Sequence, residues 1–494
     1  METVESLSIA IIGTGFGGLA AAIGLKTRGF HDIVILEKAD DVGGVWRENT
    51  YPGAACDVPS PFYSYSFEPN PRWPHRFSRQ PAILDYIRTV ADKYDVSRHI
   101  RFGTEVLGLT YDAATGKWTV ALSTGAPLVV DVLVSAVGQL SRPAFADIPG
   151  RNLFTGESFH SAQWDHDVDL TGKRVAVIGT GASSIQFVPQ IQQQVAELVL
   201  FQRSAPYVIP RFDREFSPRH HRVFETVPAT ELAERATWYG VVEGLSIAWV
   251  YSKPLSRVLK RLSKWHMRRQ TKSKPGLFEK VWPDYPIGCK RILFSNDYLP
   301  ALAQPNVDVV TERIREITPG GIVAEDGHVH NVDVIVWGTG FKATEFLEPM
   351  SIKRADGRRL TDEWSGGAHA YYGMTVPGFP NLLNMYGPNT NTGGGSIIYF
   401  LESQAAYLAD YVTHIAATGT PLQVRPDVER SYDERVQQEL RGSVWSQCTS
   451  WYRQADGRIT TNWPWLGVQY RRQAKFRPSD YESVSVTGRL PELR

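Results

Sequence analysis

The sequence predicts an α/β protein, and an internal repeat and the chain length support this prediction. An apolar run, a glycine-rich turn and a helix-like segment follow one another from residue 9 and again from residue 175. At 494 residues the chain is too long for one compact core and favours two or three domains. The repeat therefore predicts two Rossmann-like dinucleotide-binding domains, one for each copy.

The first copy has the spacing of a dinucleotide site. The apolar run at 9–12 leads into the turn Gly-Thr-Gly-Phe-Gly-Gly, and a second apolar run at 33–36 ends at Glu37. Backbone N–H groups at the start of the helix after this turn are expected to bind a pyrophosphate. Glu37 stands 24 residues after Gly13, where a carboxylate accepts hydrogen bonds from an adenosine ribose.

The second copy differs from the first at the position that selects the ribose. The run at 175–178 leads into Gly-Thr-Gly-Ala-Ser-Ser, and the run at 198–201 is followed by Arg203, 24 residues after Gly179. A guanidinium can bind a ribose 2′-phosphate that a carboxylate would repel, so this site is expected to prefer NADPH over NADH. Ser184 replaces the last glycine, and a small residue still allows close packing of helix and strand. A solvated surface arginine is the alternative interpretation of Arg203.

The order of the segments predicts one nucleotide domain inserted into another. Residues 1–148 and 379–494 are expected to form an FAD-binding domain, and residues 149–378 an NADPH-binding domain. Helical spacing predicts a helical insertion in the second domain at about 218–285. The basic run within it, from Lys260 to Lys274, is interpreted as a solvated helix face, with contact to a membrane surface as the alternative.

Composition limits the partners to small molecules. The formal net charge is +1, which gives no reason to expect a nucleic-acid partner. No signal peptide is recognised, and the most apolar later stretch, 241–250, is shorter than the ~20 residues that span a bilayer, so no stable membrane insertion is expected. The three cysteines lie far apart, so neither a redox pair, a metal site nor a secreted disulfide framework is expected, which favours a reducing, cytoplasmic setting.

Three further motifs lie outside the two turns. Residues 154–165 match F-x-G-x-x-x-H-x-x-x-W-[P/D], residues 43–57 match a pattern from Gly-Gly-x-Trp to Asp57, and residues 288–291 read Gly-Cys-Lys-Arg. Together they resemble the type I Baeyer–Villiger monooxygenases, with looser support at 451–452 and 462–464. The resemblance covers most of the chain.

The resemblance implies FAD and NADPH as cofactors, O2 and a ketone as substrates, and an ester or lactone formed through a flavin peroxide. It implies that Arg291 lies against the flavin and nicotinamide, that Asp57 holds Arg291, and that Lys290 joins Arg203 on the 2′-phosphate. His160 is implied to link the domains and position NADPH. Taken without the resemblance, Asp57 and Arg291 are more often a surface ion pair, and a lone histidine or tryptophan is more often structural.

The candidate catalytic residues are Arg291 and Asp57. The candidate cofactor-binding residues are Gly13, Gly15, Phe16, Gly18, Glu37, Lys38, Gly44, Val45, Trp46, Tyr51, Asp57, Val106, Gly138, His160, Gly179, Gly181, Ser183, Ser184, Arg203, Ser204, Lys290, Thr339 and Gly340. The residues proposed for the substrate wall are Gly393, Gly394, Gly395, Tyr399, Phe400 and 463–465.

Three alternative functions stay open at this point. A flavin N- or S-monooxygenase shares both nucleotide folds, and an NADPH oxidase or flavin reductase passes electrons without oxygenating a substrate. A non-catalytic nucleotide-binding protein has no evident use for two cofactor sites. A monomer and a homodimer are both compatible with the sequence.

Overall fold

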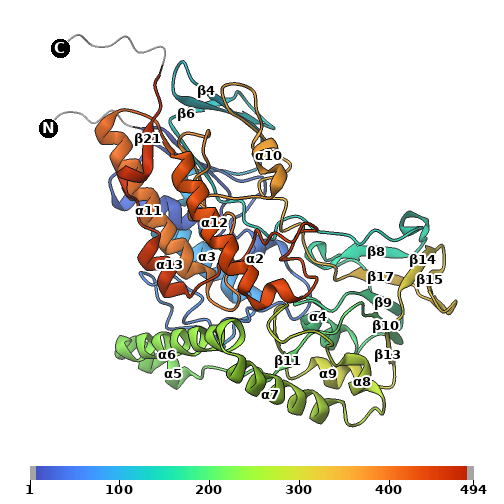
Figure 1. The fold of residues 1–494 in the computed structure, drawn as a ribbon. Helices are drawn as coiled ribbons and strands as arrows, with labels where there is room; N and C mark the ends of the chain where they lie inside the picture. The colour runs from blue at the N-terminus through green and yellow to red at the C-terminus, as the bar shows by residue number, and fades with distance from the viewer. Residues whose placement is uncertain (1–6, 487–494) are drawn as a thin grey trace, which may run out of the picture.

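The computed structural model describes residues 7–486, and its framework is two five-stranded parallel sheets (Figure 1). The strands of the first sheet, in spatial order, are β19 (Leu382–Asn384), β7 (Val132–Ser135), β1 (Ile9–Ile12), β2 (Ile33–Leu36) and β3 (Ile100–Arg101). Those of the second sheet are β13 (Val307–Val310), β10 (Glu197–Phe201), β9 (Arg174–Ile178), β17 (Val334–Trp337) and β8 (Glu157–His160). The predicted fold class is confirmed.

Each sheet is apolar on both faces because it is covered on both sides. All four residues of β1 are buried, as are four of the five residues of β9. Helix α1 (Phe16–Thr27) and helix α11 (Ile397–Thr418) pack together over the first sheet. Continuous burial of short Val- and Ile-rich runs is what a parallel sheet requires, which is why the repeat was visible in the sequence.

The smaller elements fill the space around these sheets. The remaining helices of the two units are α2 (Val45–Glu48), α3 (Gln80–Lys93), α4 (Ser184–Ile191), α9 (Tyr298–Leu302), α10 (Leu360–Glu363), α12 (Pro426–Gly442) and α13 (Gly467–Gln473). The remaining strands are β4 (Val106–Asp112), β5 (Lys117–Leu122), β6 (Leu128–Val130), β11 (Val208–Ile209), β12 (Leu293–Phe294), β14 (Ile314–Thr318), β15 (Gly321–Ala324), β16 (Val329–Asn331), β18 (Ser351–Lys353), β20 (Leu422–Val424) and β21 (Tyr481–Ser483).

The chain returns to the first unit before residue 379. Strand β18 pairs in parallel with β4, and Ile352 and Trp364 belong to the same buried cluster as Ile12 and Trp118. Residues 351–376 therefore pack on the first unit and not on the second. We propose that the return lies close to residue 340, earlier than the boundary at 378 that the sequence suggested.

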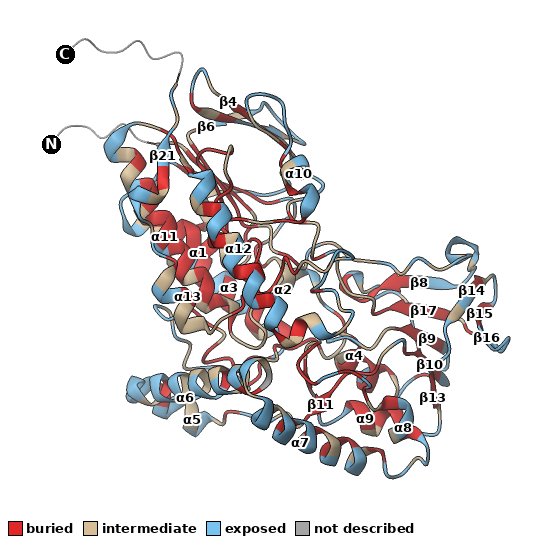
Figure 2. Ribbon diagram, in the orientation of Figure 1, coloured by how far each residue is buried: buried red, intermediate tan, exposed pale blue. Residues whose placement is uncertain are grey.

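The expected helical insertion forms a row of helices along one edge of the molecule. It consists of α5 (Pro218–Thr226), α6 (Pro228–Ser246), a π-helical turn at Ile247–Tyr251, α7 (Lys253–Thr271) and α8 (Leu277–Val281). Figure 1 shows α6 and α7 along the lower edge, and Figure 2 shows that their outward faces are largely exposed. Within residues 7–486, no helix combines the length and hydropathy needed to cross a bilayer.

The cysteine spacing did not indicate a disulfide, but the structure contains one, so the spacing no longer supports a reducing setting. Cys289 and Cys448 form a disulfide with a Cα–Cα distance of 6.1 Å, although 159 positions separate them in the chain. Cys56 is a free, buried thiol. The bond joins the segment after the insertion to the segment after α12, and no local spacing could have predicted it.

Candidate active site

The first glycine turn is shaped by close backbone contacts. Gly13 has a φ of +99°, and a Cβ added at Gly18 would overlap the carbonyl oxygen of Gly13. Glu37, at the end of β2, accepts hydrogen bonds from the Thr14 backbone N–H (3.1 Å) and the Thr14 hydroxyl (2.6 Å). The glycine turn at the start of α1 fits the pyrophosphate of FAD, and the adjacent buried carboxylate of Glu37 fits its ribose. Thr14 itself was not singled out from the sequence.

The second glycine turn has the same construction. Gly179 has a φ of +108°, and a Cβ there would overlap the carbonyl oxygen of Gly338. Ser184 begins α4, and its hydroxyl fills the position that a Cβ on Gly338 would need. The serine that replaced a glycine therefore fits because Gly338, on the neighbouring loop, has no side chain. Both turns leave a helix N-terminus able to receive an anion.

The three residues expected around a 2′-phosphate lie together. Lys290 donates a hydrogen bond from Nζ to the Ser204 hydroxyl at 2.9 Å. Burial lowers the pKa of Lys290, and the nearby positive charge of Arg203 lowers it further. Two cations held close together favour a bound dianion between them.

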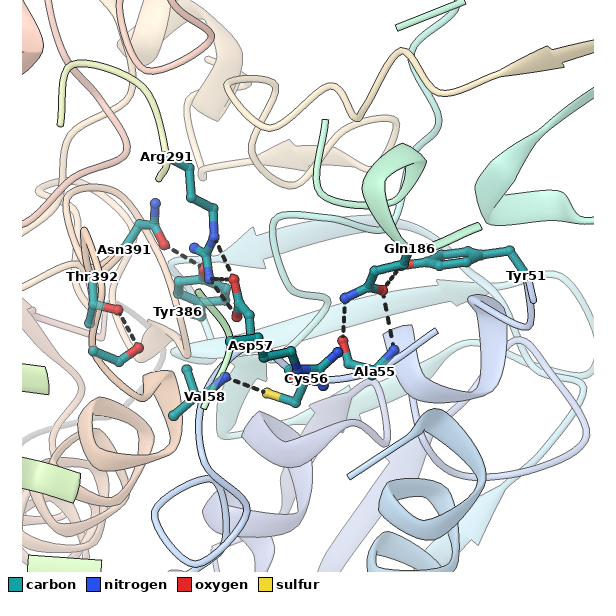
Figure 3. Close-up of polar contacts among 12 residues, drawn as sticks. Tyr51, Ala55, Cys56, Asp57, Val58, Gln186, Arg291, Tyr386, Asn391 and Thr392 are labelled. Atoms are coloured by element: carbon teal, nitrogen blue, oxygen red, sulfur yellow. Dashed lines mark hydrogen bonds and ion pairs between the residues drawn. The ribbon is translucent and has the colours of Figure 1, made fainter. Parts of the chain in front are cut away.

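Arg291 and Asp57 form a bidentate ion pair that joins two segments far apart in the sequence (Figure 3). Arg291 donates from Nε to Oδ2 at 2.9 Å, and from Nη2 to Oδ1 at 2.7 Å and Oδ2 at 2.6 Å. The Asp57 carboxylate raises the pKa of the Arg291 guanidinium above its usual value, against the opposing effect of burial. The guanidinium is thus permanently charged, and the two carboxylate oxygens of Asp57 fix its orientation.

The same pair forms the polar end of a cleft with about 450 Å³ of open space. The rest of the lining is mostly apolar and comes from three regions: Val58, Pro59 and Phe77; Trp238, Val241, Val242 and Leu245 of α6; and Ile292, Phe294, Gly393 and Gly394. Asp57 and Arg291 are therefore not an exposed surface ion pair, which was the alternative interpretation of these two residues. The contribution of α6 was not foreseen, because no local pattern indicates that an inserted helix covers a cleft.

A second cavity, with about 440 Å³ of space that is partly open to solvent, shares Gly393 with the first. Of the residues proposed for the substrate wall, Gly395, Tyr399, Phe400, Trp463 and Trp465 line this neighbouring cavity. Gly393 and Gly394 line the cleft that contains Arg291. The wall predicted from the sequence thus divides between two adjacent cavities.

His160 is buried at the end of β8. Its Nδ1 accepts a hydrogen bond from the Ala162 backbone N–H at 3.1 Å, and its ring packs edge-on against Phe145 and Phe341. Burial lowers the pKa of His160 to about 4, so the ring is neutral at physiological pH. A neutral, packed ring suits a positioning role and not proton transfer.

Trp46 and Trp164 have packing roles. The indole N–H of Trp46 donates to the Tyr63 hydroxyl at 3.1 Å, with the two rings edge to face. Trp164 packs against Phe159 and Phe187 in the core of the second unit. Both motif tryptophans therefore stabilise the segments that carry the motifs.

Gln186 of α4 joins the second unit to the segment that carries Asp57 (Figure 3). Its Oε1 accepts from the Tyr51 hydroxyl at 3.0 Å and from the Ala55 N–H at 3.2 Å, and its Nε2 donates to the Ala55 carbonyl at 2.9 Å. Ala55 stands two positions before Asp57. The sequence gave no signal for Gln186, since its partners are 131 and 135 positions away.

The remaining candidates lie at the ends of strands and helices. Gly15 and Gly44 directly precede α1 and α2, and their Cα atoms approach so closely that a Cβ on Gly44 would lie 3.1 Å from Gly15 Cα. Phe16, Val45, Val106 and Ser184 begin helices or strands, and Lys38, Gly138, Gly181, Ser183, Thr339 and Gly340 lie in the turns next to them. Thr339 donates from Oγ1 to the Ala144 carbonyl at 2.5 Å.

The comparisons with known proteins agree with this geometry. The flavin-binding monooxygenase-like family matches residues 6–230. A Baeyer–Villiger monooxygenase of Streptomyces coelicolor is 45% identical over 475 residues, covering 95% of this chain and 91% of the relative. A Baeyer–Villiger monooxygenase of Pseudomonas aeruginosa is 44% identical over 483 residues, covering 97% of this chain and 91% of the relative.

Solved structures extend the similarity to the whole fold. The closed crystal structure of cyclohexanone monooxygenase superposes with a TM-score of 0.86 at 26% identity, covering 97% of this chain and 99% of that one. A complex of OTEMO with FAD and NADP superposes with a TM-score of 0.86 at 27% identity, with the same coverage. The chain therefore belongs to the Baeyer–Villiger monooxygenase family and is a flavin-dependent monooxygenase of this type.

Proposed function

We propose that this enzyme binds FAD at the first glycine turn and NADPH at the second, and converts an apolar ketone and O2 to an ester or lactone. The observation that carries the proposal is the fixed Arg291–Asp57 pair at the polar end of an apolar cleft. An apolar cleft with one charged end orients a ketone by its carbonyl group. The relatives named as Baeyer–Villiger monooxygenases support the same reaction class.

Arg291 is proposed as the catalytic residue. The reduced flavin, when bound, supplies the electrons that activate O2. The permanently protonated Arg291 guanidinium, held by Asp57 at the end of a mostly apolar cleft, would stabilise negative charge that develops on oxygen without having to reorganise. Asp57 is proposed as the residue that positions Arg291, because its carboxylate binds both Nε and Nη2.

Arg203, Ser204 and Lys290 are proposed to bind the 2′-phosphate of NADPH. Their support is the Lys290–Ser204 hydrogen bond and the lowered pKa of Lys290 next to Arg203. His160 is proposed to position NADPH through packing, since its ring is neutral and buried. The other candidates along the two turns are proposed to bind cofactor through backbone groups and close packing.

The location and assembly of the enzyme are also proposals. We propose a cytoplasmic enzyme that is a monomer or a homodimer and has no nucleic-acid partner. The near-neutral net charge of +1 supports the absence of a nucleic-acid partner. Light scattering of the FAD-loaded protein checks the oligomeric state.

The test measures NADPH consumption by FAD-loaded enzyme with and without a panel of ketones, and quantifies esters and hydrogen peroxide in the same samples. We expect ester formation to match ketone-dependent NADPH use. Sulfoxides or N-oxides as the only products would favour a heteroatom monooxygenase. Hydrogen peroxide in step with NADPH use under every condition would favour an oxidase.

Arg291→Ala, Arg291→Lys and Asp57→Asn separate the chemistry from electron delivery. Ester formation is expected to fall by about 10²-fold or more in Arg291→Ala, because that variant removes the charge that stabilises the transition state. Arg291→Lys keeps the charge but loses the two-pronged geometry, so a smaller loss is expected. Unchanged ester formation in Arg291→Ala would refute the assigned role.

A further inference from the structure

We propose that helix α7 docks this enzyme on the surface of a lipid bilayer that carries anionic headgroups. The proposal concerns a surface outside the active site and does not depend on the identity of the ketone. It replaces the interpretation of the basic run as a merely solvated helix face.

Exposed apolar side chains are concentrated in the insertion. Eighteen large hydrophobic residues are exposed within the described part of the chain, and nine of them lie in the insertion, from Val223 to Trp265. Single exposed apolar residues are normal on any protein, whereas a concentration of them marks an interaction surface. The apolar surface of the insertion therefore needs a partner.

Three of these residues lie on α7 with helical spacing. Leu255, Val258 and Trp265 are 46%, 57% and 55% exposed, and the half-buried Leu262 lies between the last two. We call these four residues the α7 stripe. Steps of three or four residues place them along one face. Tyr251, which ends the preceding π-helical turn, is not part of the stripe, because it lines the second cavity and donates a hydrogen bond to the Pro464 carbonyl.

The α7 stripe is distinct from the face that holds the helix on the protein. The buried residues of α7 are Leu259, Ser263, His266, Met267 and Thr271. Steps of four residues join Leu259, Ser263, Met267 and Thr271, and His266 precedes Met267 directly. Their face lies about a third of a turn from the α7 stripe. The helix is thus fixed by one apolar face and presents a second one outward, along the edge that Figures 1 and 2 show uncovered.

The rest of the exposed surface of α7 is cationic. The exposed cations of the helix are Lys253, Arg257, Lys260, Arg261, Arg268 and Arg269, and the half-buried Lys264 lies over the ring of Trp282. No acidic residue occurs between Glu243 and Glu279, and no cation of α7 makes an ion pair with a residue in the described range 7–486. On a chain with a net charge of only +1, this helix is a local concentration of unneutralised positive charge.

An anionic bilayer surface satisfies both features together. The apolar side chains enter the boundary between headgroups and acyl chains, where tryptophan is favoured, and the long basic side chains reach the phosphates. A nucleic acid would match the cations but leave the α7 stripe in water. A second copy of this chain would bring a second set of unpaired cations to the same face, which is unfavourable.

The experiment is sedimentation of the FAD-loaded full chain with vesicles of phosphatidylcholine alone or of phosphatidylcholine mixed with phosphatidylglycerol. We expect about tenfold or greater enrichment on the anionic vesicles, reduced at high salt. The intrinsic tryptophan emission of the wild type should shift to the blue on binding, and Trp265→Phe should lose most of this shift. No binding to the anionic vesicles would overturn the proposal.

Two variants test the two features separately. Leu255→Gln/Val258→Gln/Trp265→Gln removes the apolar character, and Arg261→Gln/Arg268→Gln removes two positive charges. Both are expected to lose most vesicle binding while keeping the NADPH oxidation rate and melting temperature of the wild type. The matched control is Leu153→Gln/Val329→Gln, which changes two residues that are 60% and 48% exposed outside the insertion, and it should bind as the wild type does.

The variants also identify competing partners. Full binding by the triple glutamine variant would mean that charge alone holds the vesicles, and the proposal would fail. A wild-type dimer that becomes a monomer in the triple variant, with no vesicle binding by either protein, would assign the stripe to a second copy and also overturn the proposal.

Discussion

At the scale of single residues, the role proposed for Arg203, Ser204 and Lys290 predicts that the second nucleotide site distinguishes NADPH from NADH. Arg203→Ala is expected to raise the KM for NADPH by about 10-fold to 100-fold, because a charge-assisted contact to a phosphate is lost. The KM for NADH should hardly change, since NADH has no 2′-phosphate. Steady-state kinetics with both cofactors measure the difference.

The control for this variant is Arg315→Ala. Arg315 is an exposed arginine of β14, in the same nucleotide-binding unit, that pairs with its neighbour Glu316. It should leave both KM values unchanged. Equal increases for NADPH and NADH in Arg203→Ala would contradict a role at the 2′-phosphate and favour a general effect on folding.

His160 predicts a pH dependence of stability. Its pKa is lowered by burial to about 4, from an ordinary value of 6.5. Between these values the unfolded state binds a proton that the folded state excludes, so the free energy of unfolding falls as the pH drops from 6.5 towards 4. The stability contribution is fully present above pH 6.5. His160→Gln removes the titration and should flatten the slope in this window by up to about 1.4 kcal/mol per pH unit.

Urea unfolding of the wild type and His160→Gln at pH 7 and pH 5 measures this effect. The variant is less stable at pH 7 because it loses the packing of the imidazole ring, and the gap should narrow at pH 5. A gap of the same size at both pH values would show that the folded protein binds the proton as readily as the unfolded chain.

At the scale of elements, the start of α1 requires glycine at one position and tolerates alanine next to it. A Cβ at Gly18 would overlap the Gly13 carbonyl oxygen, whereas a Cβ at Gly17 would meet Met385 Cβ at 3.4 Å, an ordinary contact. Gly18→Ala is therefore expected to lose most of its FAD, and Gly17→Ala to retain it. The ratio of flavin to protein absorbance after purification reports the result, and equal flavin content in both variants would contradict the prediction.

The Cys289–Cys448 bond ties the segment after α12 to the segment that carries Lys290 and Arg291. Because it closes a loop of 159 positions, its removal in Cys448→Ser should destabilise the protein by about 2–4 kcal/mol. Cys289→Ser should have the same effect, and the double variant no more than either single one, since all three remove one bond. Melting temperatures of the three variants test this pattern.

Thiol titration of the unfolded protein provides a direct check of the bond. Only Cys56 should react without a reductant, and all three cysteines should react after reduction. Three reactive thiols in unreduced protein would show that the bond is absent under the conditions of purification.

The elements that could be predicted from the sequence are those with a local signal. Glu37 and Arg203 were found because a strand, a turn and a helix set their distance from Gly13 and Gly179. The α6 wall of the cleft, the pairing of β18 with β4 and the Cys289–Cys448 bond depend on tertiary packing between distant segments. No periodicity or spacing encodes such contacts, so the structure was needed to find them.

At the scale of the whole molecule, the catalytic role proposed for the Arg291–Asp57 pair requires the two nucleotide-binding units to keep their relative position. Asp57 belongs to a segment of the first unit, whereas Arg291 follows the insertion in the second. Gln186 makes three hydrogen bonds to Tyr51 and Ala55, just before Asp57. The side chain of Gln186 therefore links the position of Asp57 to helix α4 of the second unit.

Gln186→Leu should disturb the relative position of the two units while leaving each unit folded. Leucine has a similar volume but cannot make the three hydrogen bonds, and the loss leaves the Ala55 N–H and carbonyl without these partners, at a cost of about 1–3 kcal/mol. Asp57 would then hold Arg291 less firmly, so a larger fraction of NADPH should be converted to hydrogen peroxide and a smaller fraction to ester. The matched control is Gln192→Leu, at the end of the same helix. The Gln192 side-chain amide donates a hydrogen bond to Asn306 Oδ1 within the second unit. An equal product ratio in the two variants would show that the contact between the units stabilises the fold without controlling the chemistry.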